Sequence, residues 1–382
     1  MNAKRIYLDN AATTPVRAEV EQAMREAADG GNYNPSSLHA EGRRARAVLD
    51  DARARIAAIL GAAPKEITFT ASGTEGNNLS LMGVARALDG RRHIVASTIE
   101  HHSVLEPLER LREDGFRVTL LPVARDGRVD PQRFAEALEP ETGLAAIMYA
   151  NNEVGTVQPI AELAAIARER GVLVHTDAVQ APSWLPVDVR ELGIDMLSLS
   201  AHKFGGGEGV GLLYARGGVP LAPILSGGGQ EFGRRSGTEN VVGIAGMARG
   251  LELAATERAV QAPRIAALRD RLEAGISSAL PEVHVNGGGA PRLANILNVS
   301  FAGVDSATLL IGMDLAGLAV SAGSACTSGT LEPSHVLQAM GLEERLRGSA
   351  LRFSLGAATS AEEIERVLEI VPRMVTELRG DG

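Results

Sequence analysis

One lysine of this chain stands in a setting that suits chemistry rather than simple solvation. The sequence holds 38 basic residues, and lysine occurs among them at positions 4, 65 and 203, with arginine at the others. A lysine amine can lose its proton and condense with a carbonyl group, whereas an arginine guanidinium stays charged. Because an arbitrary lysine is usually a solvated surface residue, the neighbours of Lys203 decide how it is interpreted.

Lys203 follows an apolar stretch, residues 195–200, whose pattern predicts a buried strand. A glycine-rich segment, residues 205–209, comes directly after it, and glycine lets a backbone approach a ligand closely. Open α/β folds bind ligands at the carboxyl ends of their strands. We therefore expect Lys203 at the mouth of a sheet.

A carboxylate, Asp177, ends another predicted buried strand, residues 172–177. An aspartate can equally be a helix cap or a surface charge, but the apolar run before it favours a buried charge that has a partner. Pyridoxal phosphate requires this pair of groups: an amine that forms a Schiff base and a carboxylate that keeps the pyridine nitrogen protonated. Lys203 and Asp177 together predict a pyridoxal-phosphate site.

The single cysteine of the chain, Cys326, excludes an intrachain disulfide and a multi-cysteine metal site. A lone cysteine is more often a small buried hydrophobic residue than a nucleophile. The surrounding segment 321–330 is small, polar and spaced by glycine, a composition typical of a mobile surface loop. A thiol on such a loop is exposed and is predicted to be reactive.

A phosphate site is predicted where strand 67–71 passes through a turn of small residues, 72–74, into a helix from about residue 75 to 88. The N-terminus of a helix presents unpaired N–H groups and the positive end of the helix dipole, and both suit a phosphate. Many strand-to-helix turns share this pattern, so an ordinary cap remains the alternative for this turn taken alone.

Strands and helices alternate from residue 67 to 214, which predicts the α/β class with a mainly parallel sheet between helices. Candidate site residues fall at the ends of these strands: Thr74, His101, Asn152, Asp177 and Lys203. Because the carboxyl ends of parallel strands share one edge of a sheet, we expect these side chains to converge.

The C-terminal part has another character. Two consecutive helices are expected at 242–260 and 264–280, and after residue 281 the alternating stretches 295–301 and 350–355 predict half-solvated strands of a smaller α+β domain. We therefore expect a large domain over 16–257 and a small domain made of 1–15 and 258–382.

The overall composition argues against several classes of binding partner. With 45% apolar residues the chain can bury two modest cores. A formal net charge of −9 and the lack of a basic cluster with interleaved aromatics argue against nucleic-acid binding. No apolar run approaches the ~18 residues of a membrane span, and the first residues lead into no signal-peptide segment. These features predict a cytoplasmic protein that binds no membrane.

Beyond these patterns, the sequence resembles the pyridoxal-phosphate cysteine desulfurases of the NifS/IscS type, in the class V aminotransferase group. The motifs that carry the resemblance extend over nearly the whole chain: LDNAATTP (8–15), GTE (73–75), EH (100–101), NNEVG (151–155), HTDAVQ (175–180), SAHK (200–203), RSGT (235–238), SACTS (324–328), LEPS (331–334) and RFSLG (352–356). The resemblance implies the type I fold of pyridoxal-phosphate-dependent transferases.

The resemblance also implies a role for each site residue toward the cofactor. Lys203 would bind pyridoxal phosphate covalently and move the substrate Cα proton. Asp177 would pair with the pyridine nitrogen, and Gln180 and Asn152 would bond the ring hydroxyl. His101 would stack on the ring and take part in proton transfer. The phosphate would be held by Gly73, Thr74, Ser200 and His202, with Thr238 reaching it from the other subunit of a homodimer.

For the substrate, the resemblance implies L-cysteine. Arg352, together with Asn152, would bind its carboxylate, and Cys326 would attack its sulfur, leaving L-alanine and a persulfide on the enzyme. The sulfur would pass to an acceptor protein such as an iron–sulfur scaffold, for iron–sulfur cluster assembly or another thiolation. No metal site is assigned, and only a transient role of Cys326 as an iron–sulfur ligand is left open.

Two other functions stay open at this point. One is a selenocysteine lyase or cysteine sulfinate lyase of the same fold, which can work without the thiol. The other, of a different class, is a non-catalytic sulfur-transfer scaffold, which the presence of every assigned group disfavours. The sequence does not identify the sulfur acceptor or its pathway.

Overall fold

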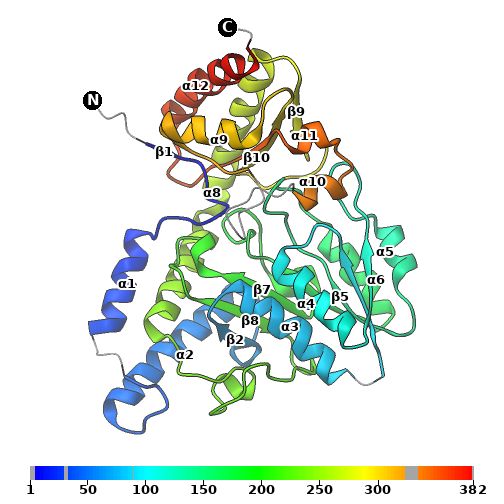
Figure 1. Cartoon of the computed structure of the whole chain (residues 1–382). Coiled ribbons are helices and arrows are strands. Elements are labelled where there is room, and N and C mark those ends of the chain that lie inside the picture. The colour runs from blue at the N-terminus through cyan, green and yellow to red at the C-terminus, as the bar shows by residue number, and fades with distance from the viewer. Residues whose placement is uncertain (1–4, 30–32, 89, 323–333, 381–382) are drawn as a thin grey trace.

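The computed structural model describes residues 5–29, 33–88, 90–322 and 334–380. Cys326 and the rest of residues 323–333 lie outside the described residues. Figure 1 shows a larger part built around one sheet and a smaller part that carries the C-terminal helix.

The larger part is organised around a seven-stranded sheet with the order β2-β8-β7-β6-β5-β3-β4. Its strands are β2 (Ile67–Thr70), β3 (His93–Ser97), β4 (Arg117–Leu121), β5 (Thr142–Ala146), β6 (Leu173–Asp177), β7 (Met196–Ser200) and β8 (Gly211–Ala215). Strands β3 to β7 pair in parallel, and β8 is antiparallel to both of its neighbours. The predicted α/β class with a mainly parallel sheet is confirmed.

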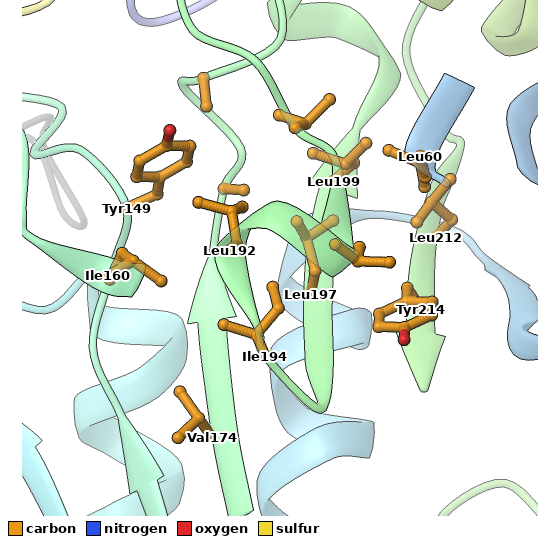
Figure 2. Packing of buried hydrophobic residues seen from close by; sticks show 14 of the residues in the cluster. Leu60, Tyr149, Ile160, Val174, Leu192, Ile194, Leu197, Leu199, Leu212 and Tyr214 are labelled. Atoms are coloured by element: carbon orange, nitrogen blue, oxygen red, sulfur yellow. The ribbon is translucent and has the colours of Figure 1, made fainter. Parts of the chain in front are cut away.

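Helices cover both faces of this sheet, because alternate side chains of each strand point to opposite faces. The helices are α1 (Ala18–Asp29), α2 (Ala40–Leu60), α3 (Gly73–Ala87), α4 (His102–Glu113), α5 (Pro131–Ala137), α6 (Ile160–Glu169), α7 (Val189–Leu192) and α8 (Val241–Ala279). Leu197 and Leu199 of β7 join a core that includes residues of α2, α6 and α8 (Figure 2). Met196, on the other face, packs in a core with residues of α3 and α4.

The smaller part has its own core and two small sheets. Strands β9 (Val283–Asn286), β10 (Ile296–Phe301) and β12 (Ala350–Ser354) form an antiparallel sheet, and β1 (Ile6–Tyr7) pairs in parallel with β11 (Leu318–Ala319). Its helices are α9 (Ser306–Leu315), α10 (His335–Ala339), α11 (Glu344–Arg347) and α12 (Ala361–Arg379). Ile6 and Leu8 from the start of the chain are buried in this core, so the first residues pack with the last ones. The expected boundaries at 15/16 and 257/258 stay a prediction.

One helix prediction was wrong. The two helices expected at 242–260 and 264–280 are a single helix, α8, with Pro263 inside it. A proline removes one backbone hydrogen bond and normally breaks or kinks a helix. Here Met247 and Leu251 are buried in one core, while Ile265 and Leu272 are buried in the other. The packing on both sides of Pro263 outweighs the local preference for a break.

In the parts of the chain that the structure describes, no helix is long and apolar enough to span a membrane.

Candidate functional site

The predicted site residues come from the carboxyl ends of neighbouring strands and from the helix N-termini that follow them. β6 ends at Asp177, and β7 runs into a 3₁₀ turn, Ala201–Lys203, that carries Lys203. His101 is the N-cap of α4, and Gly73 and Thr74 form the first turn of α3. The structure therefore brings together the strand-end residues on which the sequence argument rested.

The amine of Lys203 is withdrawn from water and is held by the N-terminal segment. Its Nζ donates to the carbonyl oxygens of Ala11 and Ala12, both at 2.7 Å. Burial and, to a smaller extent, the charge of Arg352 outweigh the opposing charges of Asp177 and Asp9 and lower the pKa of Lys203 to about 8. An amine with this pKa loses its proton readily near neutral pH, which suits condensation with a carbonyl.

The carboxylate of Asp177 is almost fully buried and is oriented by two donors. Its exposed fraction is 7%. Oδ2 accepts from Nδ2 of Asn77 at 2.7 Å, and Oδ1 accepts from the backbone N–H of Val179 at 3.0 Å. A buried acid held in one orientation can face a protonated pyridine nitrogen.

The first turn of α3 forms a close-fitting cradle. The side chain of Ser72 caps the helix by accepting from the N–H of Glu75 at 3.1 Å, and the N–H groups of Gly73 and Thr74 have no partner within a helix at these positions. A Cβ at position 73 would lie 2.7 Å from Cγ2 of Val179 and 3.3 Å from Cβ of Ser200. Position 73 therefore requires glycine, and the N–H groups and Ser200 are placed to hold an anion.

His202 enters the same region as a neutral ring. Burial lowers its pKa to about 4, and the charge of Lys203 contributes in the same direction. Its Nδ1 lies 3.1 Å from Oγ1 of Thr13. Because the ring carries no charge at neutral pH, it can contribute to the site only as a hydrogen-bonding group.

Gln180 and Asn152 lie at the edges of the site, and Thr238 lies elsewhere. Nε2 of Gln180 donates to the carbonyl of Ala11 at 2.9 Å, the same oxygen that Lys203 contacts. The carbonyl of Asn152 accepts from Nη1 of Arg352 at 2.8 Å. Thr238 lines a different pocket, between α1, α2 and the start of α8. Within one chain, therefore, Thr238 does not join the group.

Arg352 on β12 is a buried guanidinium, 2% exposed, with a carboxylate partner. Its Nη2 donates to Oδ1 of Asp9 at 2.7 Å, and its Nε has no hydrogen-bond partner in the described residues. The ion pair with Asp9 fixes the orientation of the guanidinium from one side.

Three residues that contact the site were not predicted to belong to it: Asp9, Asn77 and Ser103. Asp9 was present in the N-terminal motif without a role. Asn77 lies four residues after Gly73 and so on the same face of α3, which was the available signal. Ser103 accepts from Nδ2 of Asn77 at 2.8 Å, and its Oγ lies 2.8 Å from Nδ1 of His101.

A cavity of about 560 Å³ opens beside Lys203, between the two parts of the chain. Asn10, Gln180, Trp184 and Gly356 are among its lining residues. The described residues include no group of three or more His, Cys, Asp or Glu that could hold a metal ion. Cys326, for which a transient iron–sulfur role was left open, lies outside them.

Comparison with known proteins agrees with this geometry. The aminotransferase class-V family model matches residues 6–367. A relative from Dictyoglomus turgidum, named cysteine desulfurase IscS, is 46% identical and covers 98% of this chain and 96% of its own. Among solved structures, a NifS-like protein has a TM-score of 0.91 at 37% identity, covering 98% of this chain and 100% of its own. SspA in complex with cysteine has a TM-score of 0.82 at 36% identity, covering 93% and 100%.

A lysine of lowered pKa, a buried acid and an anion cradle at one sheet edge define a pyridoxal-phosphate enzyme, and the chain belongs to the aminotransferase class-V family. Within that family it is a cysteine desulfurase of the NifS/IscS type. Its cofactor is pyridoxal phosphate, and the residues present fit that group: the Lys203 amine, the Asp177 carboxylate and the glycine-dependent turn at position 73.

In protein stripped of cofactor, Lys203 is expected to react with acetic anhydride at lower pH than Lys65. Only the unprotonated amine is acylated, and the pKa of Lys203 is about 8, whereas an exposed lysine titrates near ~10.4. Peptide mass spectrometry after labelling between about pH 6 and 10 gives the midpoint of each profile. Lys65, which is exposed, is the internal control, and coinciding midpoints would contradict the lowered pKa.

Asp9→Asn is expected to reduce the free energy of unfolding by about 1.5–3 kcal/mol, because a buried guanidinium loses its charged partner. Urea unfolding followed by circular dichroism measures the change. The matched control is Asp314→Asn, which removes a pair with Arg5 whose side chains are 62% and 56% exposed; it is expected to cost less than about 1 kcal/mol. Equal effects of the two variants would refute a structural role for the Asp9–Arg352 pair.

Proposed function

We propose that this protein takes the sulfur atom from L-cysteine, releases L-alanine and holds the sulfur as a persulfide on Cys326. The observation that carries the proposal is the buried Lys203 amine, with a pKa of about 8, at the same sheet edge as the Asp177 carboxylate. An amine and an acid in this relation serve pyridoxal phosphate, which, when bound, supplies an electron-accepting ring.

Each predicted residue has a task in this scheme. Lys203 would hold the cofactor and move the proton of the substrate Cα, and Asp177 would pair with the pyridine nitrogen. His101 would stack on the ring and take part in proton transfer, while Gln180 and Asn152 would bond the ring hydroxyl. The phosphate is bound by the turn and its neighbours: Gly73, Thr74, Ser200 and His202. Support for these roles comes from the contacts among these residues and their positions at the strand ends.

Arg352 and Asn152 bind the substrate carboxylate in the proposal. Nη1 and Nη2 of Arg352 already have partners in Asn152 and Asp9, whereas Nε has none in the described residues. The substrate carboxylate would therefore meet a guanidinium that is already fixed in orientation. Fixing the donor before binding lowers the entropy that binding costs.

The sulfur step balances without an external oxidant. The thiolate of Cys326 attacks the substrate sulfur, so that one S–S bond forms and the Cβ–S bond breaks. The electron pair of that bond stays with the carbon, which takes up a proton and becomes the methyl group of alanine. The enzyme thiol and the substrate together thus give alanine and a persulfide.

We further propose that the protein works as a cytoplasmic homodimer and hands its sulfur to an acceptor protein, such as an iron–sulfur scaffold. The position of Thr238 supports the dimer, because Thr238 lines a pocket away from Lys203 in its own chain. In a dimer it reaches the phosphate of the other subunit.

With L-cysteine and a reductant, the purified protein is expected to release sulfide and alanine in equal amounts. Cys326→Ala is expected to lower this turnover at least ~100-fold, because the reaction loses its nucleophile. Mass spectrometry of the protein without reductant should show a sulfur adduct in the wild type and none in the variant. Ser278→Ala, on an exposed turn of α8, is the matched control.

Unchanged turnover of cysteine by Cys326→Ala would refute the persulfide step. Loss of activity on cysteine with retained activity on selenocysteine would support both the persulfide step and the lyase alternative in part. A protein that never turns over either amino acid, although it binds the cofactor, would favour the non-catalytic scaffold.

Subunit complementation tests the dimer. Lys203→Ala and Thr238→Ala proteins are each expected to have low activity, and a mixture unfolded and refolded together is expected to recover activity. One site of the mixed dimer then holds an intact Lys203 and an intact Thr238 from different chains. Recovery no greater than the sum of the two separate proteins would contradict a shared site.

A further inference from the structure

A chain of hydrogen bonds joins the Asp177 carboxylate to the His101 ring through two residues that have no assigned role. Nδ2 of Asn77 donates to Oδ2 of Asp177 at 2.7 Å and to Oγ of Ser103 at 2.8 Å. Oγ of Ser103 lies 2.8 Å from Nδ1 of His101. Asn77 is 1% exposed and Ser103 is 7% exposed, so the two bonds that Asn77 donates are buried and shielded from competing water, whereas the bond to His101 is partly buried.

The orientation of the Asn77 amide follows from its neighbours. A nitrogen between a carboxylate and a hydroxyl uses both of its hydrogens. The flipped amide would place its oxygen against the carboxylate of Asp177, an unfavourable contact between two acceptors. The amide oxygen in the observed orientation is buried and has no partner in the described residues, so the two donated bonds determine how Asn77 lies.

The hydrogen of the His101 ring can be placed by the same reasoning. The backbone N–H of Ser103 donates to Nδ1 of His101 at 3.0 Å, and an N–H can only donate. Nδ1 therefore carries no hydrogen, and the neutral ring has its hydrogen on Nε2. Because Ser103 Oγ already accepts from Asn77, its own hydrogen is directed to Nδ1 as a second donor.

We propose that Asn77 and Ser103 are positioning residues that link His101 to Asp177 and hold the His101 ring in its neutral form with the hydrogen on Nε2. A proton added at Nδ1 would meet two donors, so the imidazolium form is disfavoured. The inference rests on the proposed function only for the part that His101 plays in the reaction.

The charges around His101 are consistent with a neutral ring. Crowding by protein atoms lowers its pKa, and the charges of Lys203, His102 and His335 act in the same direction, while only Asp177 raises it. His335 belongs to α10 and lies against His102, with ring centroids 4.9 Å apart.

The neutral form with the hydrogen on Nε2 limits the chemical roles that are open to His101. Its Nε2–H can donate a hydrogen bond to negative charge that develops on the cofactor or the substrate. Its lone pair on Nδ1 is turned toward Ser103, so the part of His101 in the proposed proton transfer is that of a hydrogen-bond donor through Nε2 and not that of the base. Removal of the Cα proton then falls to Lys203, whose amine is the base of lowered pKa.

The protonation state of the His101 ring can be measured by NMR in the cofactor-free protein labelled with [15N]histidine. Long-range proton–nitrogen correlation spectra distinguish the two neutral forms and the imidazolium, and the loss of one set of signals in His101→Gln assigns His101. The wild type is expected to show the Nε2–H form throughout the neutral range. Ser103→Ala removes one donor to Nδ1 and is expected to raise the titration midpoint of His101 by about one pH unit.

Matched variants separate this role from a merely structural one. Ser103→Thr keeps the hydroxyl and is expected to restore the wild-type midpoint. Asn77→Ala removes the donors to both Asp177 and Ser103 and is expected to weaken cofactor binding about tenfold. Asn78→Ala changes the adjacent asparagine, whose Nδ2 bonds only backbone carbonyls, and is expected to leave the His101 form unchanged.

A hydrogen on Nδ1 in the wild type, or an unchanged midpoint in a folded Ser103→Ala protein, would overturn the proposal. If Ser103→Ala does not fold, the Asn77→Ala spectrum decides in its place: it is expected to show a raised titration midpoint of His101, and an unchanged midpoint would overturn the proposal. Because these spectra need neither cysteine nor cofactor, their outcome is independent of whether the protein proves to be a desulfurase.

Discussion

The hydrogen bonds from the Lys203 amine to the carbonyls of Ala11 and Ala12 join the two parts of the molecule at the candidate site. The segment that carries these carbonyls begins in the smaller core, where Ile6 and Leu8 are buried. It then crosses to the larger part, where the N–H of Thr14 donates to the carbonyl of His202 at 2.9 Å. The site therefore exists only when the start of the chain, β7 and β12 are packed together.

Buried ionisable groups in and near the candidate site are stabilised in two ways: some have a partner, and others are neutral. Arg352 is paired with Asp9, and Asp177 receives two hydrogen bonds. Other buried groups give up their charge: burial raises the pKa of Glu100 to about 8 and lowers that of His175 to about 4. Both follow from the cost of placing an unpaired charge away from water.

The sequence predicted the parts of this arrangement that depend on local pattern. Lys203 and Asp177 could be found because each ends a buried apolar strand, and Gly73 because it opens a helix after a strand. Asn77 and Asp9 could not be assigned, because their partners lie 100 and 343 residues away along the chain. Such contacts depend on how strands are ordered in the sheet. The prediction of a helix break before Arg264 was wrong for a related reason. Buried residues on both sides of Pro263 keep α8 continuous.

The continuity of α8 has a mechanical consequence. Its 39 residues span roughly 58 Å at the rise of an α-helix, and each half is anchored in a different core. Arg352 lies in the smaller part and Lys203 in the larger part. A change in the distance between them therefore requires α8 to bend or tilt. Pro263 lies between Leu253, the last buried residue of the first half, and Ile265, the first of the second, and it leaves one backbone carbonyl without its usual donor. The missing hydrogen bond makes this point the one at which α8 bends most easily.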